Sequence, residues 1–335
     1  MNIQKNISLK PYNTFGIDAI AKQFVSVSTI NELEEVIKDH SSFLILGGGS
    51  NVLFTNEVIP FVIHLNLKGI DILNYSDDYV FIKVAAGENW HSFILWCIEH
   101  HFGGIENLSL IPGNVGASPI QNIGAYGVEV KDCIDEVETL EISTLEKHVF
   151  KNSDCQFGYR DSIFKNELKG KHIITSVIFK LTTKNHILNT AYGAIGEALS
   201  EKGITKPSIK DISNTVISIR ESKLPNPKEI GNGGSFFKNP VISSQHFKEL
   251  QNKYITIPYY IVSESVVKIP AGWLIEQAGF KGLKKRNSGV HSKQALVLIN
   301  YGNAKGIEIL ELANEIQDSI FKMFNISLEI EVNII

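Results

Sequence analysis

The 335-residue sequence predicts an α+β fold, and three observations lead to that prediction. Strand and helix patterns alternate over the first third, strands with an apolar period of two occupy the middle, and an amphipathic helix between two strands ends the chain. A chain of this length is expected to form two or three domains. Apolar residues make up 43% of the chain and charged residues 20%, which is typical of a soluble globular protein.

The first third alternates between the two kinds of element. Thr29 and Glu32 match a capping box, which opens a helix that turns Leu33, Val36 and Ile37 inward. A second, mainly apolar helix is predicted over residues 90–101. The strand at 43–46 is expected to be fully buried. The predicted strands cover residues 24–27, 43–46, 52–54, 61–65 and 80–85.

The remainder begins with strands and ends with helices and strands. Residues 137–142 alternate with period two, and residues 173–181 predict a second strand. The stretch 206–227 contains three prolines and several polar residues, which suits a junction between domains. Further elements are a helix starting in 271–278, a buried strand at 294–299, an amphipathic helix with Ile307, Leu310, Ala313, Ile316, Ile320 and Phe324 on one face, and a last strand at 328–335.

Composition excludes several classes of protein. The net charge of −4, with no block of Lys or Arg, gives no electrostatic field for nucleic acid. Cys97, Cys133 and Cys155 match neither a disulfide framework nor a zinc pattern, so we predict no metal site and expect a reducing cytoplasm. The N-terminal residues lack the apolar core of a signal peptide. No run reaches the ~18 apolar residues of a membrane span.

A glycine-rich loop, Gly47-Gly48-Gly49-Ser50-Asn51, follows the predicted strand at 43–46. The phosphate loop of a Rossmann fold would occupy this place. However, the GxGxxG spacing is missing, and the next residues predict a strand where that fold would begin a helix, so the Rossmann interpretation fails. Backbone amides in a glycine turn can still form a nest for a pyrophosphate.

A second loop, residues 111–127, holds four glycines and two prolines with almost no charge. Such a stretch is poorly explained as a solvated linker and better explained as a wall against a flat, largely apolar ligand. Two neutral glycine loops without a Rossmann motif favour a flavin dinucleotide, bound as in the vanillyl-alcohol-oxidase-type flavoenzymes. Composition by itself leaves other ligands open.

A third glycine-rich stretch, Gly231–Pro240, presents Ser235 ahead of two aromatic residues, a cation and an amide. Glycine adopts positive φ and lets a backbone approach a ligand closely, so the stretch is a candidate site. It is equally typical of a loop between strands, in which Ser235 would be only a turn residue.

Taken in order along the chain, these motifs resemble the UDP-N-acetylenolpyruvoylglucosamine reductases, the MurB family, over nearly the whole length. Members of this family bind FAD noncovalently and use NADPH to reduce UDP-N-acetylglucosamine enolpyruvate to UDP-N-acetylmuramate, a precursor of bacterial peptidoglycan. The stretches that carry the resemblance are Asn13–Gly16, Gly47–Asn51, Ile111–Gly127, Gly158–Ser162, Gly231–Pro240, Ala271–Ile275 and Gln294–Asn300.

The resemblance also implies a domain organisation. Residues 1–66 and 67–218 would form two subdomains of the vanillyl-alcohol-oxidase-type FAD-binding fold. Residues 219–322 would form an α+β substrate-binding domain, and residues 323–335 a strand that returns to the active site. The resemblance further implies a cytoplasmic bacterial enzyme that does not bind nucleic acid or membrane, and we expect a monomer.

By the same resemblance, the two neutral glycine loops hold FAD. The residues implied are Gly47, Gly48, Gly49, Ser50, Asn51, Ile111, Pro112, Gly113, Gly116, Ala117, Ser118, Ile123 and Gly124.

The nucleotide sugar is assigned to polar, cationic and aromatic side chains at matched positions. The run Ala191-Tyr192-Gly193 resembles the longer form of the family, in which a tyrosine loop folds over the bound substrate. The implied substrate-binding residues are Tyr126, Tyr159, Tyr192, Arg220, Lys223, Asn239, Tyr260, Lys268 and Gln294.

Three residues are implied in the chemistry. Arg160 would pair with the substrate carboxylate as negative charge develops there, and Ser235 would protonate the strongly basic carbon beside it. Glu331 would hydrogen-bond the same carboxylate or hold Arg160; its neighbours Ile330 and Asn333 depart from the usual proline and arginine of the family. The residues alone leave an Arg160–Asp161 ion pair and an edge-strand position for Glu331 open.

Two alternative functions remain at this point. The first is another flavin enzyme of the same fold, such as an oxidase that passes electrons to oxygen; the glycine loops suit both, but the motifs of Arg160 and Ser235 suit only the reductase. The second is a nonenzymatic protein that binds UDP-sugars. Such a protein would tolerate the loss of Arg160, Ser235 or Glu331, and all three are present.

Overall fold

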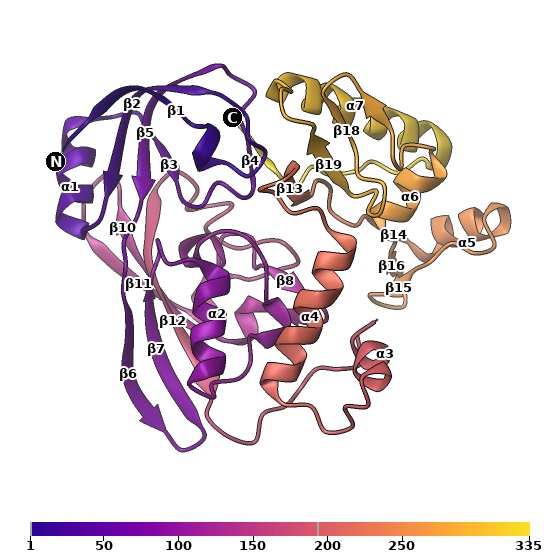
Figure 1. The fold of residues 1–335 in the computed structure, drawn as a ribbon, viewed down its shortest axis with the longest axis horizontal. Coiled ribbons are helices and arrows are strands. Elements are labelled where there is room, and N and C mark those ends of the chain that lie inside the picture. Colours follow the sequence, from indigo (N-terminus) through magenta and orange to yellow (C-terminus); the bar gives the residue numbers. More distant parts are fainter. Residues whose placement is uncertain (1, 193) are drawn as a thin grey trace. The chain divides into compact units, whose positions relative to one another are not determined.

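The computed structural model describes residues 2–192 and 194–335, and the chain folds as two units (Figure 1). Residues 8–20 and 49–59 pack with the C-terminal residues rather than with the rest of 1–66. The glycine loop at 47–51 is therefore divided between the units after Gly48. The first unit comprises the N-terminal stretch up to Ile7, Ala21–Gly48 and Pro60–Ser222, and the second comprises Ser8–Ile20, Gly49–Ile59 and Lys223–Ile335.

In the first unit, helix α1 (Ile30–Asp39) packs on a four-stranded sheet. The predicted capping box is present: Glu32 N donates to Thr29 Oγ1, and Thr29 N donates to Glu32 Oε2, both at 3.2 Å. The helix buries Leu33, Val36 and Ile37, as predicted. The strand order is β1 (Gln4–Ser8), β2 (Ile20–Val27), β5 (Val58–Leu65) and β3 (Leu44–Leu46).

Strand β3 runs parallel to β5 and forms one edge of this sheet. Only Leu46 of β3 is buried, whereas Leu44 and Ile45 are half-buried. The prediction of a fully buried strand at 43–46 is therefore wrong for most of its length, because an edge strand is covered on fewer sides than a central one. The edge position nevertheless carries the chain directly into the glycine loop at 47–51.

The first unit also contains a five-stranded antiparallel sheet that helix α2 (Trp90–Glu99) covers (Figure 1). Aromatic rings join the two layers: the centroid of Phe93 lies 5.0 Å from that of Phe179. The strand order is β11 (Lys147–Lys151), β10 (Ile134–Glu141), β12 (His172–Thr182), β7 (Tyr79–Ala85) and β6 (Ile70–Ser76).

Strand β6 was not predicted because its apolar alternation changes phase after Ile72, where the pairing with β7 is irregular, and because its side chains are mostly exposed. The hairpin of β8 (Gly124–Ala125) and β9 (Val128–Glu129) also lies in this unit. Short 3-10 helices are η1 (Lys10–Tyr12), η2 (Glu106–Leu108), η3 (Val115–Ala117), η4 (Val130–Asp132) and η5 (Asn152–Cys155).

Residues 206–227, predicted only as a junction, are mostly helical. Helix α4 (Ile209–Lys223) packs on helix α3 (Ala194–Glu201), and the three prolines of the stretch stand outside the helix. The chain changes unit at the end of α4, after Ser222. The buried residues that join the two helices are Ile195, Leu199, Ile212, Val216 and Ile219.

The second unit combines small sheets with three helices. Helix α7 (Gly306–Phe324) contacts strands β18 and β19, and parallel pairing joins β20 to β4. The helices are α5 (Ser244–Lys253), α6 (Ala271–Gln277) and α7. The strands are β4 (Val52–Leu53), β13 (Gly231–Ser235), β14 (Val241–Ser243), β15 (Tyr260–Ile261), β16 (Val266–Lys268), β17 (Lys284–Lys285), β18 (Ser288–Val290), β19 (Val297–Asn300) and β20 (Asn333–Ile334).

The C-terminal elements differ from the prediction in two details. The core face of α7 contains Ile309 and Leu312, whereas the predicted Ile307 is 44% exposed and the predicted Leu310 is only half-buried, because both lie beside that face. The predicted last strand at 328–335 is regular only at Asn333–Ile334. Upstream of it, Ile330 forms a single bridge to Phe237.

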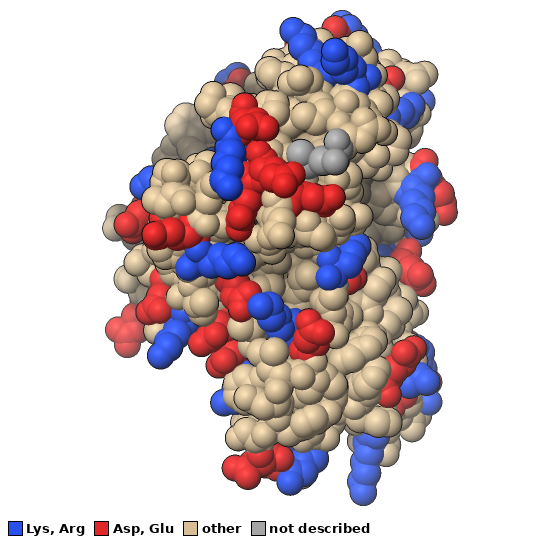
Figure 2. Space-filling model, turned by 90° about the vertical axis from the view of Figure 1, so that its left-hand side faces the viewer, with Lys and Arg blue, Asp and Glu red and all other residues tan. Residues whose placement is uncertain are grey.

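The surface carries both signs of charge. Lys and Arg side chains are interspersed with Asp and Glu side chains over the face that Figure 2 shows, and acidic groups gather in its upper part. Among the helices of residues 2–192 and 194–335, none is both long and apolar enough to cross a lipid bilayer.

Candidate functional site

The first unit brings the start of one glycine loop against the other. A Cβ atom at Gly48 would lie 2.8 Å from Asn114 Oδ1 and 3.0 Å from Gly113 Cα. Glycine is therefore required at position 48, because any side chain would separate the two loops. Within the described residues, the Gly48 amide donates to no acceptor, so its N–H is available to a ligand.

The loop at 111–127 is fixed by hydrogen bonds and by packing against neighbouring protein residues. Gly116 N donates to Ala86 O at 2.9 Å, and a Cβ atom on Gly116 would lie 2.5 Å from the Ala86 side chain. The buried hydroxyl of Ser118 donates to Val115 O at 2.7 Å. Part of the small-residue character of this loop thus serves its own packing, while Pro112 and Ala117 remain exposed.

In the second unit, the end of the first glycine loop meets the C-terminal tail. Asn51 Nδ2 donates to Glu331 O at 3.1 Å, and Asn333 N donates to Asn51 O at 3.0 Å. Gly49 has φ +57°, and a side chain there would overlap the carbonyl oxygen of Tyr12. The predicted FAD-binding residue Asn51 and the predicted catalytic residue Glu331 are therefore neighbours.

Ser235 ends strand β13, which pairs irregularly with β19. Its side chain is exposed, while the next two residues, Phe236 and Phe237, are completely buried and anchor it. Glu331 N donates to Phe236 O at 2.9 Å, so the tail runs beside this segment. Residues Gly231–Ser235 of the glycine-rich stretch thus form a strand rather than a loop, and Ser235 directly precedes Phe236, whose carbonyl oxygen accepts from Glu331 N.

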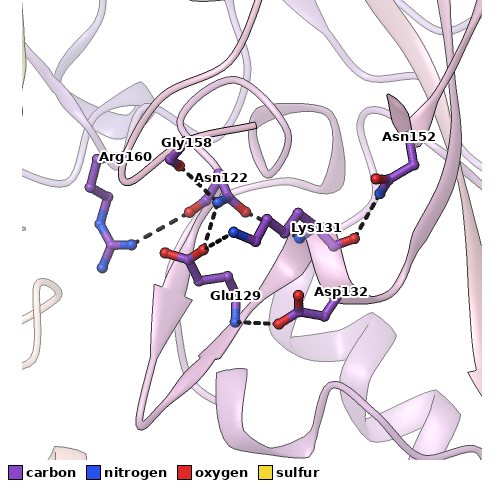
Figure 3. A network of polar contacts seen from close by, with 7 residues as sticks. All are labelled: Asn122, Glu129, Lys131, Asp132, Asn152, Gly158 and Arg160. Carbon is purple, nitrogen blue, oxygen red and sulfur yellow. Dashed lines mark hydrogen bonds and ion pairs between the residues drawn. The ribbon is translucent and has the colours of Figure 1, made fainter. Parts of the chain in front are cut away.

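Arg160 lies in the first unit, in a tight turn with φ +55° (Figure 3). Its Nη2 donates to Gly124 O at 2.6 Å and its Nη1 to Asn122 O at 3.4 Å. The guanidinium carbon also lies 5.4 Å from the ring centroid of Tyr159. The carboxylate of Asp161 accepts from Asn166 Nδ2 at 2.9 Å. Arg160 is therefore tied to the glycine loop.

A second cluster in the first unit joins Tyr126, Tyr192 and Arg220. The rings of Tyr126 and Tyr192 meet edge to face with centroids 6.2 Å apart. Burial raises the pKa of Tyr126, and a hydrogen bond from Arg220 opposes that shift. Burial also lowers the pKa of Arg220, whose Nε has no hydrogen-bond partner among the described residues. An unsatisfied buried N–H of a cation favours an anionic ligand.

His91, which the sequence analysis did not single out, supports this cluster. Its Nδ1 accepts from Leu110 N at 3.0 Å, immediately before the glycine loop at 111–127. Burial, followed by the positive charge of Arg220, lowers the pKa of His91. The neutral ring that this hydrogen bond requires is thereby favoured.

The other predicted substrate residues lie in the second unit. Tyr260 and Lys268 face each other across β15 and β16. Asn239 Oδ1 accepts from Ala271 N at 2.9 Å, which caps the start of α6, and Gln294 Oε1 accepts from Leu296 N at 3.3 Å. Lys223 is exposed at the end of α4. Gly193, the last residue of the predicted tyrosine-loop motif, lies outside the described residues.

Two family models match the chain. The model described as "FAD binding domain" matches residues 21–144. The model described as "UDP-N-acetylenolpyruvoylglucosamine reductase, C-terminal domain" matches residues 226–335. Strand β3, helix α2 and the first glycine loop fall in the former match, and Ser235 and Glu331 fall in the latter.

Comparisons with whole proteins agree with the family models. The chain is 54% identical to a UDP-N-acetylenolpyruvoylglucosamine reductase of Flavobacterium johnsoniae and 48% identical to that of Amoebophilus asiaticus, with 100% of each chain covered. A crystal structure from Thermus caldophilus matches with a TM-score of 0.71 at 23% identity, covering 100% of this chain and 99% of the other. A VAO-type flavoprotein from Myceliophthora thermophila matches with a TM-score of 0.50 at 12% identity, covering 95% and 73%. The two structures support the predicted fold class.

Proposed function

Because the chain belongs to the UDP-N-acetylenolpyruvoylglucosamine reductase family, we propose that it reduces UDP-N-acetylglucosamine enolpyruvate to UDP-N-acetylmuramate for peptidoglycan synthesis. The observation that carries the function is 54% identity over the full length of both chains. The enzyme is an FAD-dependent oxidoreductase that uses NADPH. Bound FAD would supply the hydride chemistry that links NADPH to the enolpyruvyl double bond.

The residues of the first unit fit FAD. The Gly48 amide faces no protein acceptor, and the approach of Gly48 to Gly113 leaves no room for a side chain there. We propose that the backbone of these two loops holds the dinucleotide, since backbone amides in glycine turns bind phosphate oxygens. The thirteen residues that the family resemblance assigns to FAD remain part of this proposal.

Arg160 is proposed to hold the carboxylate of the substrate. Addition of hydride to the methylene carbon leaves negative charge on the adjacent carbon, and this charge spreads into the carboxylate. A guanidinium never deprotonates under these conditions and pairs with both carboxylate oxygens. Because Gly124 O and Asn122 O fix the guanidinium beforehand, Arg160 does not need to reorganise as the charge develops.

Ser235 is proposed to give the proton that completes the reduction. Its hydroxyl is exposed and its backbone is fixed by the buried Phe236 and Phe237. A serine hydroxyl is a weak acid and can protonate only a strongly basic atom, which the carbon beside the carboxylate becomes after hydride addition. Glu331, whose backbone contacts Phe236 O and Asn51 Nδ2, is proposed to hydrogen-bond the same carboxylate.

The nucleotide diphosphate is proposed to bind Tyr126, Tyr192 and Arg220. The buried Nε of Arg220 has no hydrogen-bond partner among the described residues, and a phosphate oxygen would supply one. The sequence-assigned residues of the second unit, Lys223, Asn239, Tyr260, Lys268 and Gln294, and Tyr159 of the first are proposed to contact the remainder of the substrate.

The function is tested by the colour and the activity of the purified protein. We expect a yellow protein whose FAD is released on denaturation, because no His or Cys stands in the two glycine loops as a covalent anchor. Beyond the one equivalent that reduces the bound FAD, NADPH should be oxidised continuously only when the enolpyruvyl substrate is present, and mass spectrometry should detect UDP-N-acetylmuramate. A protein that cannot be reconstituted with FAD would overturn the proposal, and fast turnover with oxygen alone would favour the oxidase.

The remaining expectations concern the domain boundaries, the cellular location and the oligomeric state. We propose that residues 1–66 and 67–218 supply the FAD-binding subdomains, 219–322 the substrate-binding domain and 323–335 the returning tail. A cytoplasmic location is proposed because Cys97, Cys133 and Cys155 are free thiols, as expected in a reducing compartment. Light scattering of the holoenzyme tests the proposed monomer.

A further inference from the structure

Asn122 is a polar side chain with 0% exposure in the middle of the second glycine loop, and the proposed mechanism gives it no task. Resting on the role proposed above for Arg160, we propose that Asn122, supported by Glu129, is a positioning residue that fixes the Arg160 guanidinium (Figure 3). Asn122 touches neither reactants nor FAD in this proposal and acts through Arg160.

The side chain of Asn122 forms three of the four hydrogen bonds that an amide can make. Its Nδ2 donates to Gly158 O at 2.9 Å and to Glu129 Oε2 at 3.0 Å. Its Oδ1 accepts from Lys131 N at 3.1 Å. This set of partners requires an amide side chain, because a carboxylate could not donate hydrogen bonds to Gly158 O and to Glu129.

These contacts hold Arg160 from both ends. The bond to Gly158 fixes the turn that carries Arg160, since Gly158 also pairs with Asp161 on the other side of it. The backbone carbonyl oxygen of Asn122 accepts from Arg160 Nη1 at 3.4 Å, so the main chain that the Asn122 side chain fixes also contacts the guanidinium. Asn122 therefore contacts both the turn that carries Arg160 and the Arg160 guanidinium.

Glu129 links the Asn122 side chain to the hairpin that contacts Arg160. Its carboxylate accepts from Asn122 and forms an ion pair with Lys131 at 2.9 Å. Its backbone pairs with Gly124 in the β8–β9 hairpin, and Gly124 O accepts from Arg160 Nη2 at 2.6 Å. A Cβ atom on Gly124 would lie 3.0 Å from Arg160 Nη1, so the hairpin and the guanidinium are in direct contact.

Backbone conformation points to the same role. Asn122 has φ +43° and Arg160 has φ +55°. Asparagine adopts this left-handed region more readily than most residues, whereas arginine needs support from its surroundings to stay there. Left-handed non-glycine residues that surrounding contacts over-determine are characteristic of functional sites.

The main test uses Asn122→Ala with Asn152→Ala as the matched control. Asn152 Nδ2 also donates to two backbone carbonyls, Lys131 O at 2.7 Å and Ile134 O at 2.8 Å, but it does not contact Arg160 (Figure 3). In the FAD-loaded enzymes, stopped-flow absorbance follows flavin reduction by NADPH and reoxidation by the enolpyruvyl substrate separately. We expect Asn122→Ala to slow only reoxidation, by about 10²-fold, the scale of an ångström-sized misplacement. Asn152→Ala should leave both rates near wild type.

A second readout does not depend on turnover. Calorimetric titration compares the enolpyruvyl substrate with UDP-N-acetylglucosamine, which lacks the carboxylate. Asn122→Ala should lower affinity for the former and leave affinity for the latter unchanged. Equal losses for both ligands would overturn the proposal, because they would mean that Asn122 only stabilises the loop.

A double-mutant cycle distinguishes this inference from the proposed function. In an Arg160→Ala background, Asn122→Ala should cost nothing further in reoxidation rate, because the group that it positions is gone. A full additional loss would overturn the inference while leaving Arg160 as the carboxylate-binding cation. No loss in Arg160→Ala alone would instead overturn the role proposed for Arg160.

Glu129→Gln keeps the test decisive if Asn122→Ala does not fold. Glutamine retains one oxygen that can accept from Asn122 but loses the charge that pairs with Lys131. We expect a smaller loss in reoxidation than Glu129→Ala causes, again absent in the Arg160→Ala background. Indistinguishable wild-type rates in both Glu129 variants would overturn the support assigned to Glu129.

Discussion

At the scale of single residues, four of the left-handed non-glycine residues gather at the proposed site, and the others lie elsewhere in the chain. Leu110, Asn122, Tyr126 and Arg160 all have φ between +43° and +59° without being glycine. All four lie in or beside the second glycine loop or the turn that it holds. Each conformation is disfavoured in isolation and survives because neighbouring hydrogen bonds fix it. The sequence could indicate the loop but not which of its residues carry this strain.

Replacing Ser235 by alanine should separate hydride transfer from proton transfer. Flavin reduction by NADPH requires no proton from this hydroxyl and should stay near the wild-type rate. Reoxidation by the enolpyruvyl substrate should slow by at least ~10²-fold, the scale of a lost general acid. Stopped-flow absorbance measures both half-reactions.

Ser235→Cys is the companion variant, and it should recover part of the lost rate, because a thiol can deliver a proton from nearly the same place. If the alanine variant reoxidises as fast as wild type, Ser235 is only the last residue of β13, and Glu331 becomes the next candidate donor.

Tyr192→Phe should weaken binding of the UDP-sugar while flavin reduction by NADPH stays nearly intact. The ring would keep its edge-to-face contact with Tyr126, so only the hydroxyl is lost. We expect that hydroxyl to contact the diphosphate when the loop closes over substrate. Titration calorimetry gives the affinity, and Tyr75→Phe, on the exposed strand β6, is the control. Equal losses in both half-reactions would show that Tyr192 is structural.

At the scale of secondary structure, close backbone approach rather than helix propensity explains the glycine at the start of α7. Gly306 is its first residue, and it is buried against the backbone of Phe54 and Thr55. A Cβ atom at this position would overlap the carbonyl oxygen of Phe54. Elsewhere in a helix alanine is the better residue, so the glycine reflects packing and not local preference.

Gly306→Ala should therefore destabilise the second unit. We expect a loss of about 1–3 kcal/mol in its free energy of unfolding, the usual range for overpacking, despite the higher helix propensity of alanine. Urea denaturation followed by circular dichroism provides the measurement. Asn314→Ala, at an exposed position of the same helix, should be neutral or slightly stabilising. Equal stability of the two variants would contradict the packing argument.

At the scale of the whole molecule, histidine burial predicts how stability depends on pH. Burial is the main cause that lowers the pKa values of His64, His91, His172 and His291 from their ordinary value of 6.5. Between the folded and unfolded pKa values, the unfolded chain binds more protons than the folded chain. These residues therefore contribute stability that is complete above pH 6.5 and is lost as the pH falls below it.

The urea concentration at the unfolding midpoint of the holoenzyme should accordingly decrease as the pH is lowered from 7 to 5.5. Substituting His91 by glutamine should remove part of that dependence, since glutamine does not titrate. A second loss is expected below the ordinary carboxyl pKa of 4.5: burial raises the pKa of Glu138, but hydrogen bonds from Lys83 and Ser176 outweigh it and leave the pKa lowered. A midpoint that rises on acidification through this range would show that the histidine shifts have the opposite sign.

The sequence by itself determined the fold class, the capped helix α1, helix α2 and the strands with clear apolar patterns, because local periodicity and capping are written in neighbouring residues. It also identified the glycine loops and, through resemblance, the family and the cofactor. It did not predict the exposed strand β6, and it predicted residues 206–227 only as a junction, although most of them form helix α4. Exposed strands and polar helices between prolines give weak local signals.

Only the tertiary structure decided which residues meet. It placed Asn51 beside Glu331, 280 residues later, and it divided the first glycine loop between two units. It also brought Asn122 into contact with Gly158 and with Arg160, although 38 residues separate Asn122 from Arg160. Hydrogen bonds between distant segments depend on how sheets and loops close on one another, and closure is a property of the whole packed chain that no window of sequence contains.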